Sequence, residues 1–238
     1  MSFIVFIIGL CVGSFVNVVA YSIPKKLDFM KRRSFCDCCR HQLSFIDMIP
    51  IMSFILLKGR CRYCRHSIPI RYSFVELLCG FIAVIFYNSY SVYYAVLLFI
   101  FMMIFIVISL IDIDTMIIYD TLLLCLFIIG MFALSYYHIS FVNRFIGMIV
   151  ISLPLILFNH FVIESFGGGD IKLYIILGFL LGIEGVLCVF VYSVFCASFV
   201  SFLLMIIKKI NKNFYIPFVP FITFGVYVYL LYGNLIYK

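Results

Sequence analysis

The chain has 238 residues, of which 66% are hydrophobic and only 11% are charged, and its mean hydropathy is +1.26. Because an average soluble domain is about 25% charged, this composition excludes an ordinary soluble protein and indicates an all-α, polytopic membrane protein. The formal net charge of +7 then reflects how the chain is oriented in the membrane, and we expect no nucleic-acid partner.

Eight apolar segments are candidate transmembrane helices, since about 20 apolar residues cross the hydrocarbon core. They lie at approximately residues 3–22, 73–89, 93–111, 117–136, 143–163, 171–184, 186–207 and 215–233. No Lys or Arg precedes the first segment, which we therefore interpret as an uncleaved span with its N-terminus outside rather than a secretory signal. Residues 46–57 number only twelve and include Pro50, so an interfacial or packed helix is expected there.

A single long polar segment, residues 22–72, joins the first two predicted spans and holds 11 of the 17 basic residues. The positive-inside rule predicts that this loop is cytoplasmic. Counting spans forward places residues 112–119, 164–170 and 208–212 on the same side. With Lys172, at the start of the span that follows residue 170, this collects 15 basic residues inside against 2 outside. Both chain ends are then expected outside.

Two CxxC pairs lie in this loop with 21 residues between them, Cys36 with Cys39 and Cys61 with Cys64. Each pair offers two thiolates from one tight turn, and two such knuckles form the tetrahedral site that suits zinc. A cytoplasmic loop lies in a reducing compartment, so a metal is expected rather than disulfides. Free thiols in a flexible loop remain an alternative, as does Cys38 as a competing ligand. Four cysteine ligands leave no open position, so the zinc would be structural.

Three carboxylates, Asp112, Asp114 and Asp120, stand where an apolar segment ends. An ionisable group at membrane depth is costly and indicates function, although the three could also mark the solvated end of a helix. A further carboxylate, Asp170, is expected on the same side of the membrane. We therefore predict that Asp112 and Asp170 form a catalytic pair.

Two aspartates held close together cannot both ionise readily, so one keeps a proton while the other takes one from water. The water then attacks a peptide carbonyl without a metal or a covalent intermediate. Gly167, Gly168 and Gly169 precede Asp170, and they are expected to let the backbone approach a substrate or helix and to break the preceding helix. A flexible linker is the other interpretation of these glycines.

One more acid, Glu76, lies inside an apolar segment. It is expected either to pair with Arg71 or to contribute to a site.

At these motifs the chain resembles the type IV prepilin peptidases, the membrane aspartic peptidases of pilus, competence and type II secretion systems. The resemblance covers residues 9–24, the paired CxxC loop, residues 46–64, 71–80, 110–120 and 167–173. It implies that Asp112 matches the first catalytic aspartate of the family and that Asp170 matches the aspartate of its GxGD motif. The implied reaction removes the short basic leader of prepilin or pseudopilin substrates at the cytoplasmic face of the cell (plasma or inner) membrane, among its lipids.

The same resemblance implies two domains. Residues 1–90 would be the half associated with methylation, in which many members use S-adenosylmethionine to methylate the new N-terminus. Residues 91–238 would be the aspartic peptidase domain. The chain departs from the family at Tyr119, Ser22 and Phe45, where proline, arginine and tryptophan are usual; the last two bear on methylation rather than cleavage.

Two other functions are compatible with these motifs. One is a zinc-stabilised membrane assembly factor or transporter without proteolytic activity, in which the carboxylates bind protons or cations. The other is a related GxGD protease that acts on preflagellin or signal-peptide remnants, against which the paired-cysteine loop argues.

Overall fold

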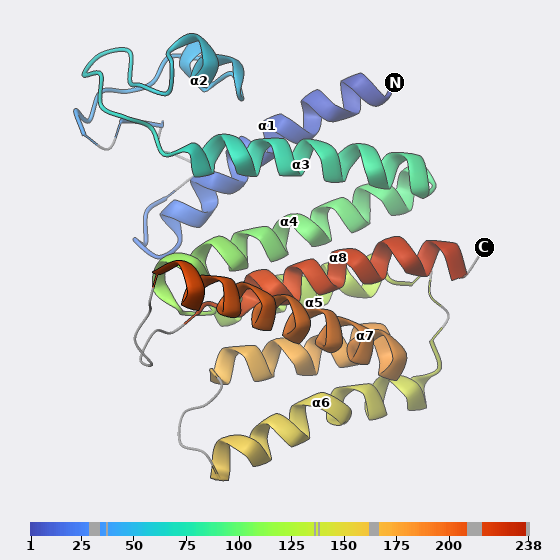
Figure 1. Cartoon of the computed structure of the whole chain (residues 1–238). Coiled ribbons are helices and arrows are strands. Elements are labelled where there is room, and N and C mark those ends of the chain that lie inside the picture. The colour runs from blue at the N-terminus through green and yellow to red at the C-terminus, as the bar shows by residue number, and fades with distance from the viewer. Residues whose placement is uncertain are drawn as a thin grey trace. The chain divides into compact units, whose positions relative to one another are not determined.

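The computed structural model describes residues 1–28, 34–36, 38–135, 137, 139–161, 167–208 and 216–236. Within these ranges the chain forms helices and no named strand (Figure 1). Five of these helices are long and apolar enough to cross a membrane, and two shorter ones are also apolar. The prediction of an all-α, polytopic membrane protein is confirmed, and each predicted span overlaps a helix. The chain divides into two compact units, residues 1–99 and 100–238.

The first unit is built on α1 (Ser2–Ser22) and α3 (Ile70–Ser89), which pack against each other. A Cβ atom on Gly9 would lie 2.8 Å from the Cα of Gly80, so the two backbones approach as closely as glycine allows. Small residues of this kind are typical of helix pairs in membranes. Between these helices the described residues form the short elements η1 (Ile46–Met48) and α2 (Met52–Leu56). Residues 46–57 thus form no spanning helix, as predicted.

The helix α4 (Val92–Thr115) begins in the first unit and continues into the second. It runs four residues beyond the predicted end at Ile111, and Met116, with φ 54, follows its last turn. The Thr115 hydroxyl donates a hydrogen bond of 2.9 Å to the carbonyl of Ile111 within that turn. This extension places Asp112 inside the helix rather than after it.

The second unit also contains α5 (Asp120–Ala133), α6 (Phe141–Phe161), α7 (Gly168–Lys208) and α8 (Val219–Ile236). Of these, α5, α6 and α8 all pack against α7. Gly147 of α6 and Gly178 of α7 face each other so closely that a Cβ on either would collide with the backbone of the other. As in the first unit, glycine permits the close helix contact.

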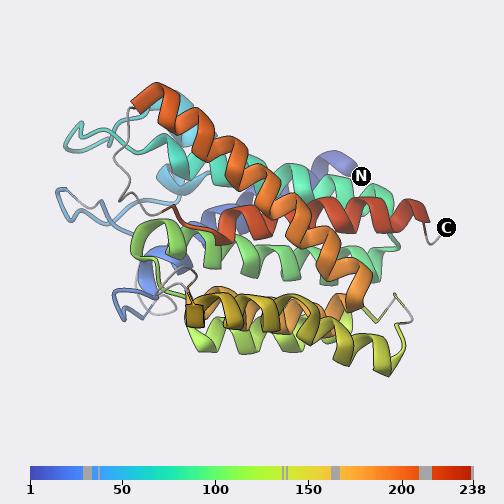
Figure 2. The ribbon, with the colours of Figure 1, turned by 60° about the horizontal axis from the view of Figure 1, so that its bottom comes forward.

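α7 is broken at Gly182, whose φ of 68 and ψ of −171 are not helical. Its second half turns back from the first at this point (Figures 1 and 2). The two halves correspond to the predicted spans 171–184 and 186–207, and the break lies slightly earlier than predicted. The positive φ explains the position, because glycine adopts it without the steric penalty of a Cβ.

Two side chains of α6 bind the backbone groups that this break exposes. Arg144 donates hydrogen bonds to the carbonyls of Phe179, at 3.2 Å, and Leu180, at 3.5 Å. The Asn143 carbonyl oxygen accepts the N–H of Ile183 at 2.9 Å. Ends of helices leave such groups without intrahelical partners, and a cation suits the C-terminal end of a helix.

Candidate active site and metal centre

Asp112 lies in the last turn of α4 and is only 6% exposed. One of its carboxylate oxygens accepts the backbone N–H of Val219, the first residue of α8, at 3.1 Å. The backbone N–H of Phe218 is a second donor to the same carboxylate. The free N–H groups at the start of α8 therefore stabilise the carboxylate of Asp112 near the end of α4, as N–H groups at a helix N-terminus can.

Asp170 lies in the first turn of α7, three residues after Gly167. Its carboxylate accepts a hydrogen bond from the Gly167 backbone, while its own N–H donates to the Gly167 carbonyl at 3.1 Å. The bond from the Gly167 backbone to the Asp170 carboxylate is one half of a capping box, in which the third helical residue binds the residue before the helix; glycine has no side chain to supply the other half. α7 begins at Gly168, three residues before the predicted span 171–184.

The three glycines before Asp170 are not equivalent. A Cβ on Gly169 would lie 2.9 Å from the Cβ of Ile118, so a side chain there would displace the segment that follows α4. A Cβ on Gly168 would meet no atom within 4 Å. The need for a small residue is therefore strongest at Gly169, where the chain passes close to its neighbour.

The fold of the second unit brings the two predicted aspartates together. The charge of Asp112 acts on Asp170, although 57 residues separate them in the sequence. One turn after Asp170, the ring of Tyr174 is fully buried, and its hydroxyl has no hydrogen-bond partner of normal geometry in the part of the chain that the structure describes. The buried Asp112 and Tyr174 and the partly buried Asp170 therefore act on one another in a region where charge interactions are stronger than in water.

The other two carboxylates of the first motif are exposed. Asp114 faces solvent from the end of α4. Asp120, at the start of α5, forms an ion pair of 2.7 Å with Lys172, and both side chains are largely exposed. These two acids therefore lie outside the buried pair.

The four predicted metal ligands, Cys36, Cys39, Cys61 and Cys64, lie in the first unit with all their sulfur atoms within 4.8 Å of one another. The sulfur atoms of Cys36 and Cys64 are 3.8 Å apart. Zinc binds thiolates at about 2.3 Å in tetrahedral geometry, which corresponds to sulfur separations of about 3.8 Å. The donor set thus fits zinc. Cys38 is exposed and is not one of the four, but its thiol interacts with that of Cys64.

Each knuckle has the same backbone design. In the first, the N–H of Cys36 binds the carbonyl of His41, and Arg40 adopts a φ of 59. In the second, the N–H of Cys61 binds the carbonyl of His66, and Arg65 adopts a φ of 60. Both knuckles read Cys-x-x-Cys-Arg-His, and this repeated six-residue pattern is the sequence signal for their shared backbone.

Opposing interactions act on the pKa of the Cys39 thiol. The backbone of His41 favours the thiolate of Cys39, but burial and the hydrogen bonds with Cys64 and Cys36 outweigh it and raise the pKa of Cys39 to about 11. A cation among the four sulfur atoms would favour the thiolates instead, as in structural zinc sites.

Comparison with known proteins covers both units. A family model described as "Bacterial Peptidase A24 N-terminal domain" matches residues 7–90, and another described as "Type IV leader peptidase family" matches residues 99–202. The chain is 30% identical over 242 residues to the prepilin leader peptidase/N-methyltransferase of Bacillus subtilis, covering 97% of this chain and 94% of that protein. The chain belongs to the type IV leader peptidase family. It is also 32% identical to the protein of the same name from Vibrio cholerae, over 90% of each chain. No solved structure matches.

One departure from the type IV leader peptidase family pattern has little effect on the backbone. Tyr119, which stands where the family usually has proline, precedes α5 with φ −83 and ψ 127. This conformation is close to the one that proline imposes. The turn after Asp112 therefore has a geometry that the usual proline would also accept.

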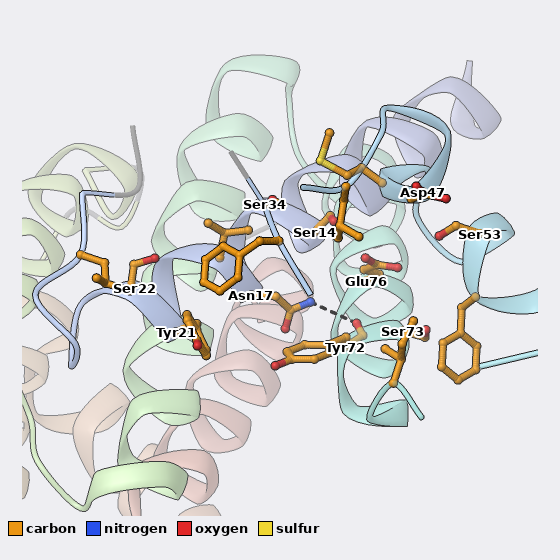
Figure 3. Close-up of a pocket in the computed structure, with 17 residues that line it drawn as sticks. Ser14, Asn17, Tyr21, Ser22, Ser34, Asp47, Ser53, Tyr72, Ser73 and Glu76 are labelled. Carbon is orange, nitrogen blue, oxygen red and sulfur yellow. Dashed lines mark hydrogen bonds between the residues drawn. The ribbon is translucent and has the colours of Figure 1, made fainter. Parts of the chain in front are cut away.

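The part of the chain matched by the family's N-terminal model contains a cavity of about 230 Å³ that sequence reasoning missed (Figure 3). Its lining includes Asn17, Tyr72 and Glu76, and the Asn17 amide donates to the Tyr72 carbonyl at 3.1 Å. In the sequence, the signal for this cavity was the presence of polar residues inside the predicted spans. Glu76 lies in the cavity wall, which favours the expectation that it contributes to a site over a pairing with Arg71.

Proposed function

We propose that this protein is a membrane aspartic endopeptidase that removes the leader of prepilin or pseudopilin substrates, with Asp112 and Asp170 as its catalytic residues. The observation that carries the proposal is the interaction of the buried Asp112 carboxylate with the partly buried Asp170 within the unit that contains the leader peptidase match. Relatives named prepilin leader peptidase/N-methyltransferase support the substrate class.

The surroundings of the two acids support different roles. Asp112 accepts two backbone N–H groups at the start of α8, which favour its ionised form. Asp170 has one backbone donor, Gly167. We therefore assign Asp112 as the base and Asp170 as the acid that carries the shared proton, although the N-terminus of α7 also favours charge on Asp170.

In the resulting mechanism, Asp112 takes a proton from water while the oxygen attacks the scissile carbonyl, and Asp170 gives its proton to the carbonyl oxygen. The tetrahedral diol then collapses. Asp112 gives its proton to the leaving nitrogen, and Asp170 recovers one from the diol hydroxyl. Both carboxyl groups return to their starting states, and no covalent intermediate forms.

The location of the reaction follows from charge. The 15 basic residues assigned to one side support a cytoplasmic position for the pair. At the cytoplasmic face, the pair of aspartates would meet the basic leader of a substrate whose apolar helix stays in the lipid of the cell membrane. Residues 91–238 would be the peptidase domain and residues 1–90 the half associated with methylation.

Two cofactors are part of the proposal. Zinc would bind the four thiolates of Cys36, Cys39, Cys61 and Cys64 and stabilise the loop, without an open position for chemistry. S-adenosylmethionine would supply the methyl group for a second activity, which the names of the relatives include. Nothing in the site favours the alternative of an assembly factor or transporter.

The test is prepilin cleavage in membranes by the unchanged chain, Asp112→Asn and Asp170→Asn, with Asp114→Asn as the matched control. Each buried substitution should reduce the cleavage rate at least about a hundredfold, because acid–base groups contribute that much or more. The exposed Asp114→Asn should cleave within about twofold of the unchanged chain. Normal cleavage by either buried variant, at equal expression, would exclude that aspartate from the pair.

A further inference from the structure

The negative charge of the aspartate pair changes place during the proposed reaction. At rest the charge is on Asp112, and it is on Asp170 once Asp170 has given its proton to the scissile carbonyl. Asp112 has two backbone donors for its charged form, whereas Asp170 has one, from Gly167. A carboxylate shielded from water needs hydrogen-bond donors. The site therefore requires a further donor for the state in which Asp170 is ionised.

The hydroxyl of Tyr174 is a donor of this kind that is not in use. Its side chain is fully buried, and the described residues offer the hydroxyl no partner of normal geometry. The Ser193 hydroxyl interacts with it from the second half of α7, but Ser193 donates its own proton to the Val189 carbonyl at 2.6 Å. A buried polar group without a partner costs free energy and is rare in native proteins, so the Tyr174 hydroxyl needs a reason to be retained.

Tyr174 is placed to reach Asp170. The two residues are four positions apart in one helix, α7, and residues with this spacing are neighbours on the helix surface. Long side chains in a helix lean toward its N-terminus, so the Tyr174 side chain leans toward the turn that carries Asp170. The charge of Asp170 acts on the Tyr174 hydroxyl, which agrees with this placement.

Aromatic contacts hold the Tyr174 ring in position. The ring of Phe190 meets it edge-on with 5.7 Å between the ring centres, and the ring of Phe218 lies 6.4 Å away. Phe218 is also the residue whose backbone N–H donates to Asp112. One residue thus packs on the phenol and binds the other aspartate. A ring fixed by its neighbours keeps its hydroxyl in the buried region beside the acids.

The charged groups on the helices around α7 leave this role to Tyr174. Asp112 of α4 is the charge that acts on Asp170. Asp120 of α5 pairs with Lys172 on an exposed surface, and Arg144 of α6 binds the break in α7. α8 carries no acidic or basic side chain among its described residues. The remaining titratable side chains of α5, α6 and α8 are not among the groups that act on Asp170 or on the phenol: Cys125, His160, Tyr227, Tyr229 and Tyr232.

We infer that Tyr174 is a positioning residue whose hydroxyl donates a hydrogen bond to the Asp170 carboxylate while that carboxylate is ionised. The inference rests on the proposed roles of the two aspartates and adds a third member to the site. The phenol keeps its proton throughout, and no covalent bond of Tyr174 changes. Its hydrogen bond lowers the free energy of the charge that develops on Asp170 and so makes Asp170 a stronger acid. A protonated Asp170 does not need this donor, which explains the unused hydroxyl.

The test is the pH–rate profile of prepilin cleavage in membranes by the unchanged chain and by Tyr174→Phe. The substitution deletes the donor and keeps the ring. The maximal cleavage rate should fall about tenfold, the effect of one hydrogen bond to a charged group. The alkaline limb should move up by about one pH unit, because the ionised form of Asp170 is destabilised. The acidic limb, which belongs to Asp112, should stay. Tyr192→Phe removes a partly exposed hydroxyl from the same helix and, as the matched control, should move neither limb.

Two further measurements separate this role from a structural one. The melting temperature of Tyr174→Phe should be unchanged or higher, because the substitution removes an unsatisfied buried group. Replacing Tyr174 with 3-fluorotyrosine, whose more acidic phenol is a stronger donor, should move the alkaline limb down. This second variant keeps the inference testable if Tyr174→Phe does not fold.

An alkaline limb that moves in neither variant, or a loss of rate at all pH values together with a lower melting temperature, would overturn the role given to Tyr174. Asp112→Asn and Asp170→Asn, assayed on the same prepilin, distinguish this outcome from failure of the peptidase proposal. If both aspartate variants lose cleavage while the limbs ignore Tyr174, the inference about the phenol alone is wrong. If either aspartate variant cleaves normally, the assignment of the pair is wrong.

Discussion

At the scale of single residues, the hydrogen bond from Val219 to Asp112 gives a direct test of which aspartate is the base. Val219 is the first residue of α8, a position where proline is well tolerated because its missing N–H has no helical partner. Val219→Pro deletes one donor to Asp112 and destabilises its ionised form. If Asp112 is the base, the acidic limb of the pH–rate profile should move up by about one pH unit, and the alkaline limb should stay.

Val219→Ala, which retains the N–H, should leave both limbs in place. A shift of the alkaline limb alone in Val219→Pro would reverse the two roles, because an acid whose ionised form is destabilised keeps its proton to higher pH. Both limbs of the pH–rate profile describe the coupled pair of aspartates as a whole. Comparing Val219→Pro with Val219→Ala isolates the effect of the hydrogen bond that α8 donates.

At the scale of elements, the contacts of Arg144 with the broken α7 should contribute substantially to stability. Arg144→Leu removes charge-assisted hydrogen bonds to the carbonyls of Phe179 and Leu180 and leaves them in an apolar region. We expect a loss of about 1–3 kcal/mol in the free energy of unfolding, measured by denaturation in detergent. Lys172→Met is the contrast, since its exposed pair with Asp120 should be worth about 0–1 kcal/mol. Equal losses in both variants would contradict the role given to α6.

Hydrophobic runs were enough to predict where the helices lie, because each span must be apolar over most of its length. They did not predict the end of α4, since Asp112 and Asp114 interrupt the apolar run while the helix continues to Thr115. Nor did they predict that α6 binds the break in α7. Those contacts join residues about 35 to 40 positions apart, and no local pattern encodes them.

At the scale of the whole molecule, metal and peptidase chemistry should be separable. Cys64→Ser removes one ligand of the tetrad and should lower zinc affinity more than about tenfold. Methylation should fall with it, because the loop belongs to the half that we associate with methylation. Cleavage should fall far less, as both aspartates lie in the second unit. The readouts are zinc content and both activities on one prepilin.

Cys38→Ser is the matched control, because Cys38 is exposed and is not one of the four clustered ligands, and serine keeps a group that can hydrogen-bond to Cys64. It should retain zinc and both activities. Parallel loss of cleavage and methylation in Cys64→Ser would show that the metal supports the peptidase as well.

Residue types and spacing were enough to single out Asp112 and Asp170 as candidates and to predict that the four cysteines cluster, because both sets use recognisable patterns. The cavity around Glu76 was not predictable in this way. Its walls come from α1, the loop and α3, and the donor to the Glu76 carboxylate is the backbone N–H of Ile51, which any non-proline residue could supply. The same holds for the N–H of Val219, which lies 107 residues from the acid it binds.

The course of α4 has a practical consequence for dissecting the protein. The division between the two units falls at residues 99 and 100, in the middle of a continuous 24-residue helix. A gene split at that point would give each fragment an incomplete helix with unsatisfied backbone groups in lipid. The natural place to separate the halves is the turn before Val92, so that a peptidase fragment would carry the whole of α4.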